Sequence, residues 1–135
     1  TSYFSNNPSP SLICQNNNDK FTVNNNNGNG KLTYPVGLVT LDEVVLAGFN
    51  TYYSNTESYI DTTNYLYTNS TYWTLSPVLV DASGGANVGS VTSSGRVNNV
   101  YVDAVRGVRP VVSLANGTLI SSNGDGTSAN PYVVE

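Results

Sequence analysis

The 135-residue chain has no histidine, no methionine and a single cysteine, Cys14. Without histidine it lacks the side chain that most often acts as a general base and most often binds metal ions. One cysteine can form neither an internal disulfide nor a zinc site built on cysteines. Cys14 is then either a buried thiol or a partner for another chain or segment. We therefore expect no metal and no cofactor.

Charge is also scarce, since charged residues make up 10% of the chain, against about 25% in typical soluble proteins. Only five residues are basic, they form no run, and the net charge is -4. Binding to nucleic acid or to an anionic membrane surface requires clustered Lys and Arg. No apolar run approaches the roughly 18 residues of a membrane-spanning helix. The composition thus argues against nucleic-acid partners and against direct membrane insertion.

The nine acidic residues are scattered, and no spacing favours the carboxylate pair of a glycoside hydrolase. We expect a non-enzymatic protein. The stretch Asn123–Thr127 superficially resembles a calcium loop, but the further ligands of an EF-hand are missing. Turn chemistry favours a tight turn there instead.

Because charged residues are few, uncharged polar residues must form most of the polar surface. The chain has ten tyrosines and roughly twenty asparagines, far above ordinary usage. Surfaces rich in Tyr, Asn, Ser and Gly are typical of secreted proteins and of binding paratopes. The length fits one domain over residues 1–135, with residues 1–18 as a linker or an N-terminal extension.

One helix is clearly indicated. Thr40 is a favourable N-cap, Glu43 completes a capping box, and Gly48 is a natural stop after about eight residues. Asp42 and Glu43 suit the positive end of the helix dipole.

Short strands are expected around this helix. Alternating or apolar stretches bounded by Gly, Pro and Asn predict strands in the ranges that follow. They are 21–23, 72–75 (ended by Pro77), 88–92, 97–102 and 108–114, with a closing hairpin of 118–120 and 132–134. Residues 49–71 should form an irregular region, in which tyrosines from Tyr52 to Tyr72 either make a contact surface or build the core.

Several segments, in order, resemble one known domain family. They are Leu38–Val44, Leu46–Gly48, Tyr72–Pro77, Gly107–Leu114, and Gly124–Thr127 with Asn130–Val134. Over roughly residues 19–135 the chain resembles C-type-lectin-like domains of surface proteins from Gram-positive gut bacteria. These belong to the branch of formylglycine-generating enzymes and of the variable proteins of diversity-generating retroelements. Some are fused behind pilin-like N-terminal helices.

The resemblance implies a compact α+β domain with short antiparallel strands, one short helix and long irregular loops. It places Trp73 and the Gly107–Leu114 strand in the core. It does not imply sulfatase activation, because the reactive cysteines have no counterpart beside Cys14. The acidic sugar-site tripeptides of calcium-dependent lectins are absent as well.

In the variable proteins, diversified positions lie between a Trp-led strand and a final Gly-x-Arg strand. Here that window is Val78–Val105, and its residues are either diversified contacts or ordinary polar loop residues. We expect ligand contacts within it, with Tyr101 as a rigid aromatic contact and Arg96 as the only cation. The candidate contacts are Asp81, Asn87, Ser90, Ser93, Arg96, Asn98, Asn99, Tyr101 and Asp103. Arg109, within an apolar strand, should serve the structure and needs a partner.

Two functional hypotheses follow from these patterns. The first is an extracellular adhesion module on a bacterial cell surface, which binds a protein or glycan ligand. The second is a structural subunit or head domain of a surface filament or pilus, which associates with copies of itself.

Overall fold

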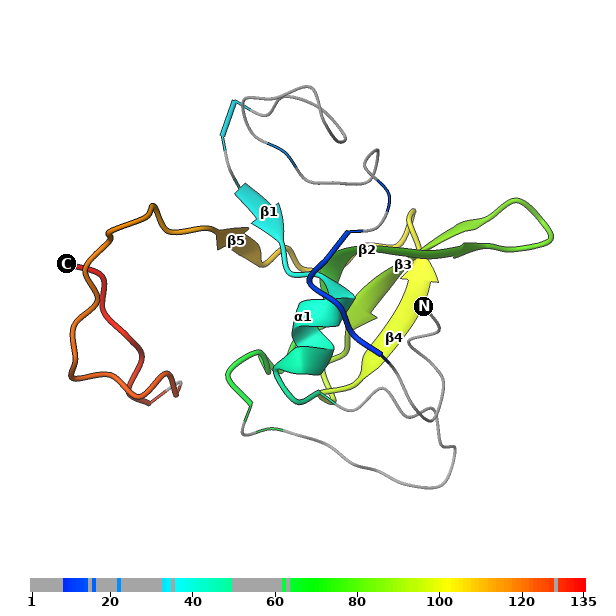
Figure 1. Ribbon diagram of the computed structural model, residues 1–135. Helices are drawn as coiled ribbons and strands as arrows, with labels where there is room; N and C mark the ends of the chain where they lie inside the picture. Colours follow the sequence, from blue (N-terminus) through cyan, green and yellow to red (C-terminus); the bar gives the residue numbers. More distant parts are fainter. Residues whose placement is uncertain are drawn as a thin grey trace.

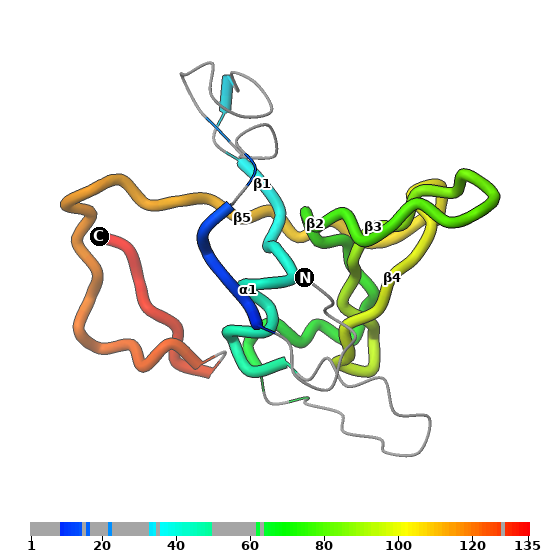
Figure 2. Tube along the Cα trace, turned by 45° about the vertical axis from the view of Figure 1, so that its right-hand side comes forward, coloured from blue at the N-terminus to red at the C-terminus, as the bar shows by residue number. Residues whose placement is uncertain are grey.

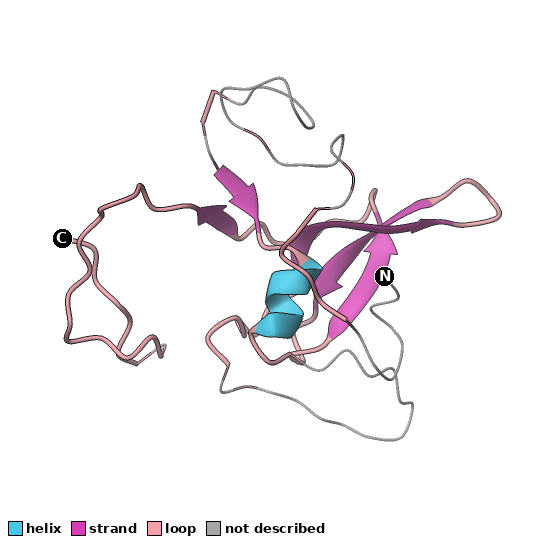
Figure 3. Ribbon diagram, in the orientation of Figure 1, coloured by secondary structure: helices cyan, strands magenta, loops and turns pink. Residues whose placement is uncertain are grey.

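The computed structural model describes residues 9–14, 16, 22, 33–34, 36–49, 62, 64–127 and 129–135. These residues form one short helix and five short strands, connected by long irregular segments (Figures 1 and 3). The elements are β1 (Val36–Leu38), α1 (Leu41–Leu46), β2 (Tyr72–Val80), β3 (Ala86–Val91), β4 (Val97–Tyr101) and β5 (Pro110–Val112). All strand pairs are antiparallel, in a β2-β3-β4 sheet and a β1-β5 ribbon. The expected α+β class, with one helix and long loops, is confirmed.

The capping box at the start of α1 forms as expected. The backbone N–H of Glu43 donates to the Thr40 hydroxyl (3.1 Å), and the Thr40 N–H donates to the Glu43 carboxylate (2.7 Å). Gly48 adopts φ +95° just beyond the helix, a conformation that costs glycine little. Both ends of the helix are therefore set by local residues.

The core lies between α1 and one face of the three-stranded sheet. Leu41 and Val44 of α1 are fully buried, as is Val91 of β3. A Cβ on Gly89 would lie 2.5 Å from Cδ1 of Leu41, so the missing side chain is what lets the helix approach the sheet this closely. The other buried apolar residues are Val39, Phe49, Leu66, Tyr72 and Val97.

The prediction that Pro77 ends its strand is wrong. β2 continues through Pro77 to Val80, with register shifts on both sides of the proline. β2 is an edge strand of its sheet, and an edge strand tolerates a residue without an N–H, especially beside bulges.

The 108–114 strand is also shorter and less buried than expected. Only Pro110–Val112 pair with β1, and Val108, Val111, Val112 and Leu114 are all exposed. Trp73 is only partly buried, and its N–H donates to the Gly107 carbonyl (3.0 Å). The prediction that Trp73 and the Gly107–Leu114 strand lie in the core is therefore wrong.

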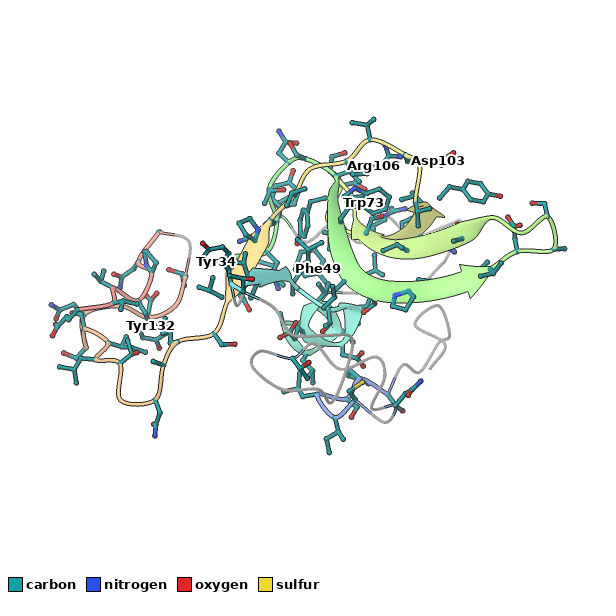
Figure 4. All side chains as sticks on the ribbon, turned by 90° about the horizontal axis from the view of Figure 1, so that it is seen from above. Tyr34, Phe49, Trp73, Asp103, Arg106 and Tyr132 are labelled. Carbon is teal, nitrogen blue, oxygen red and sulfur yellow. The ribbon has the colours of Figure 1, made fainter. Side chains whose placement is uncertain are left out.

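The closing hairpin forms with a single β-bridge, Ile120 to Val134. In Figures 1 and 2 this C-terminal part extends away from the helix and sheets, and in Figure 4 Tyr132 lies far from Phe49 of the core. Asp125 accepts a hydrogen bond from the Thr127 N–H (3.0 Å), which supports the tight turn rather than a calcium loop. The backbone N–H of Thr127 lowers the pKa of Asp125, followed by the Thr127 hydroxyl.

Some expectations fall outside the described residues. These are the strand at 21–23 (Thr22 excepted) and the tyrosines at positions 52, 53 and 59. Of the other clustered tyrosines, Tyr72 is buried, Tyr67 is half-buried and Tyr65 is exposed. Cys14 is exposed, which excludes the buried alternative.

Candidate ligand-binding surface

The β2–β3 hairpin turn is organised by one carboxylate. Oδ1 of Asp81 accepts hydrogen bonds from the Ser83 N–H (2.9 Å), the Ser83 hydroxyl (2.6 Å) and the Gly85 N–H (2.9 Å). Gly84 takes φ +86° within the same turn. The local sequence Asp-Ala-Ser-Gly-Gly thus supplies both an acceptor and a residue that tolerates positive φ.

The second oxygen of the same carboxylate holds Tyr101. The Tyr101 hydroxyl donates to Oδ2 of Asp81 at 2.6 Å. A Cβ on Gly85 would lie 2.6 Å from Cε1 of Tyr101, so the ring packs directly against the glycine backbone. About half of Tyr101 remains exposed. The chain therefore presents an aromatic ring whose position is fixed at its hydroxyl and along one edge.

This contact changes the titration of both groups. The Ser83 hydroxyl, then the Tyr101 hydroxyl and the Gly85 N–H, hold the pKa of Asp81 well below its usual range. Hydrogen bonding to Asp81, and then its negative charge, raise the pKa of Tyr101 above 10.0. At neutral pH the carboxylate is charged and the phenol protonated, so the hydrogen bond persists.

Two amides share the face of Tyr101. Asn87 pairs with Tyr101, and Gly89 pairs with Asn99. Directly opposed residues of antiparallel strands point to the same face, as do residues two apart along a strand. Asn87, Asn99 and Tyr101 therefore line one face of β3 and β4, and Asp81 adjoins them from the hairpin turn. This is the face of the sheet that packs against α1, because Gly89 on it lies against Leu41, and Asn87 and Asn99 are half-buried there while Tyr101 is exposed at its end. We call these four residues the Tyr101 surface.

The other candidate contacts lie elsewhere. Ser90 is fully buried and pairs with Trp73 and Asn98 on the opposite face of the sheet. Its placement among ligand contacts is wrong, because a side chain without exposure cannot reach a ligand. Asn98 is half-buried on that face, where its Oδ1 accepts from the Asn99 N–H (2.8 Å).

Ser93 and Arg96 lie in the β3–β4 turn, at the far end of β4 from Tyr101. The N–H groups of Ser93 and Arg96 donate to the hydroxyls of Thr71 (3.2 Å) and Thr92 (3.1 Å). At about 3.3 Å per residue, Arg96 is roughly 16 Å from Tyr101 along the strand. Asp103 is the exception: it is exposed two residues beyond Tyr101, and its negative charge adds to the effect of Asp81 in raising the pKa of Tyr101. The nine candidates therefore do not form one site.

Sequence reasoning missed a pocket on a different side of the molecule. A cavity of about 560 Å³ is lined by the N-terminal segment, α1, the 65–66 region and β5. Its walls are mainly apolar and include Leu12, Leu46, Leu66 and Val111. The pocket forms where four segments that are distant in the sequence meet, so no local motif predicts it. Apolar residues in polar stretches, such as Leu12, are the sequence feature that could have indicated it.

Arg109 borders this pocket and has the structural role expected of it. Its guanidinium donates to the carbonyls of Leu66 (2.8 Å) and Tyr65 (3.0 Å) and lies 5.7 Å from the Tyr72 ring centroid. Its partners are thus two backbone oxygens and an aromatic face rather than a carboxylate.

Within the described part of the chain, no three acidic or cysteine side chains gather as a metal site would require. No helix among those residues is long and apolar enough to cross a membrane.

The chain was compared with known proteins at three levels. A family model described as a domain of unknown function, DUF6273, matches residues 12–116. No curated protein and no solved structure matches the chain.

Proposed function

The chain belongs to the DUF6273 family, and we propose that it is a non-enzymatic extracellular module that binds a protein or glycan through the Tyr101 surface. We further propose a C-type-lectin-like scaffold and a bacterial cell-surface location, on the resemblance described above. The observation that carries the binding proposal is the 2.6 Å hydrogen bond from Tyr101 to Asp81.

A fixed, half-exposed tyrosine is well suited to recognition. Tyrosine offers a large amphipathic contact area with little conformational entropy to lose. Its hydrogen bond to Asp81 and its contact with Gly85 restrain the ring before any ligand arrives, which reduces the cost of binding. Asn87 and Asn99 add amide donors and acceptors on the same face, suitable for hydroxyls of a glycan or for peptide groups.

The test is a glycan and protein array probed with the wild-type chain and with Tyr101→Ala. We expect specific binding by the wild type and its loss in the folded variant. Arg96→Ala is the matched control, because it removes a polar side chain from the other end of β4. Binding that survives in Tyr101→Ala but disappears in Arg96→Ala would move the site to the β3–β4 turn. Arrays on which the wild type binds nothing would count against the adhesion function.

A structural subunit of a surface filament is the second candidate. It is favoured by one observation, the large apolar side chains left exposed on β5 and on the C-terminal hairpin. A subunit that packs against copies of itself requires such surfaces.

A further inference from the structure

The chain contains four Asn-Gly pairs, at residues 27–28, 29–30, 116–117 and 123–124. In such a pair the backbone nitrogen of the glycine can attack the side-chain amide of the asparagine. Glycine favours this attack because it has no Cβ beside that nitrogen and lets the backbone rotate freely. The first two pairs lie outside the described residues. The other two lie in different surroundings, so the structure distinguishes their reactivity.

The Asn116–Gly117 pair lies in an open turn. Both residues are exposed, and Gly117 has φ +85°. A Cβ on Gly117 would have no described atom within 4 Å. Thr118 closes the turn, because its N–H (3.1 Å) and its hydroxyl (2.8 Å) both donate to the Ala115 carbonyl. Rotation of the peptide between Asn116 and Gly117 would therefore open one exposed turn without displacing packed atoms of the described residues.

The Asn123–Gly124 pair is packed against the opposite arm of the C-terminal hairpin. A Cβ on its glycine would lie 2.5 Å from the carbonyl oxygen of Pro131 and 2.7 Å from Cα of Tyr132. The next residue, Asp125, fixes the two arms together, because its N–H donates to the Asn130 carbonyl at 3.0 Å. Rotation of this peptide would push the glycine against a backbone that is held in place.

Hydrogen bonding does not distinguish the two glycines. Among the described residues, neither the N–H of Gly117 nor that of Gly124 has an acceptor within hydrogen-bond distance. The side-chain amides of Asn116 and Asn123 likewise have no hydrogen-bond partner in that part of the chain, and both asparagines are exposed. The difference between the pairs is therefore the packing around the glycine.

We propose that Asn116 is a site of spontaneous deamidation and that the hairpin protects Asn123 from the same reaction. The nitrogen of Gly117 forms a bond to Cγ of Asn116, and the side-chain nitrogen leaves as ammonia with the proton of the Gly117 N–H. Water then opens the cyclic imide at one of its two carbonyls, which gives aspartate or isoaspartate. The reaction is independent of the Tyr101 surface.

Either product changes the connection between β5 and the C-terminal hairpin. It adds one negative charge to a chain whose net charge is already -4. Isoaspartate also inserts a methylene into the backbone at this point. The buried core found among the described residues includes no residue after Val97, so the fold of the helix and sheet should survive the reaction.

The experiment is incubation of the folded full chain in mildly alkaline buffer, followed by digestion with chymotrypsin and tandem mass spectrometry. Cleavage after Leu119 separates the two asparagines, and a sample taken at time zero corrects for deamidation during digestion. We expect Asn116 to react at least about tenfold faster than Asn123, equivalent to about 1.4 kcal/mol of activation free energy. In concentrated urea the packing is lost, so the two rates should become similar.

Gly117→Ala is the control for the chemistry. Its Cβ would meet no described atom within 4 Å, but it lies beside the attacking nitrogen and should slow the reaction at Asn116. The rate at Asn123 should stay the same, because the hairpin packing is unchanged. Circular dichroism checks that the variant is folded.

Three results would overturn the proposal. The first is a folded chain in which Asn123 reacts as fast as Asn116 or faster. The second is an Asn116 that is stable in the folded chain and reacts only in urea. The third is an unchanged rate at Asn116 in Gly117→Ala, which would indicate direct hydrolysis of the side-chain amide.

Discussion

Arg109 and Tyr72 donate hydrogen bonds to the same acceptor, the carbonyl oxygen of Leu66, at 2.8 Å each. The Arg109 guanidinium also donates to Tyr65 and lies over the Tyr72 ring. Burial raises the pKa of Tyr72, an effect that the nearby guanidinium opposes. Through these contacts a segment without regular secondary structure is held against β2 and against the residues just before β5.

The shared acceptor predicts coupling between the two donors. Tyr72→Phe and Arg109→Met should each lower the free energy of unfolding by about 1–2 kcal/mol, because each leaves Leu66 with one donor. The double variant removes both donors and leaves a buried carbonyl unsatisfied, so its loss should exceed the sum by about 1 kcal/mol. Urea unfolding of the four proteins measures this. Strictly additive losses would mean that the two side chains act independently.

Gly89 is predicted to be the glycine that tolerates substitution least in the core. In Gly89→Ala the added methyl would lie 2.5 Å from Leu41 and 2.8 Å from the Thr74 hydroxyl. Such overpacking should cost about 1–3 kcal/mol of stability. Gly84→Ala is the control: nothing lies within 4 Å of its added Cβ, but its φ is +86°. Its cost should be about 1 kcal/mol, from the backbone alone. Thermal or urea unfolding that ranks Gly84→Ala as the worse variant would contradict this packing.

The Asp81–Tyr101 pair should shape the dependence of stability on pH at both extremes. Since folding lowers the pKa of Asp81 below 3.8, its contribution is present above that pH and is lost as the pH falls through the folded value. Since folding raises the pKa of Tyr101 above 10.0, its contribution is present below pH 10.0 and is lost as the pH rises through the folded value.

Unfolding curves for the wild type and two variants measure both arms of this profile. Asp81→Asn should flatten the acid arm and Tyr101→Phe the alkaline arm. Profiles that all superimpose after a constant offset would show that neither group is linked to folding.

Comparing Tyr101→Phe with Tyr101→Ala distinguishes the contribution of the aromatic ring to binding from that of its hydrogen bond to Asp81. Once a ligand is identified, Tyr101→Ala should weaken binding by about 2 kcal/mol, or roughly 30-fold, as expected for a central aromatic contact. Tyr101→Phe keeps the ring but loses the hydrogen bond to Asp81, so a smaller loss of about 1 kcal/mol is expected. Isothermal titration calorimetry gives both values. Equal losses in the two variants would assign the effect to the hydroxyl rather than to the ring.

The sequence predicts local features of this fold well. The capping box and the glycine stop of α1 depend on residues within one short segment, so the sequence from Thr40 to Gly48 contains all the information they need. The period-two pattern of residues 97–102 likewise predicts β4. The same alternation places Ser90 and Asn87, which are three residues apart, on opposite faces of β3.

The sequence by itself determined which functional groups the protein has: no histidine, one cysteine, few charges, and many Asn and Tyr side chains. It also determined a helix that is capped by its own residues. The tertiary structure decided which of these side chains contact one another. The pairing of β3 with β4 brings Tyr101 to Asp81 across 20 residues, and packing outside the strands brings Arg109 to Leu66 across 43. The edge position of β2 accommodates Pro77 within a strand. Register and edge position depend on which distant strands pair, and that pairing is fixed by burying apolar area throughout the chain rather than by any short motif.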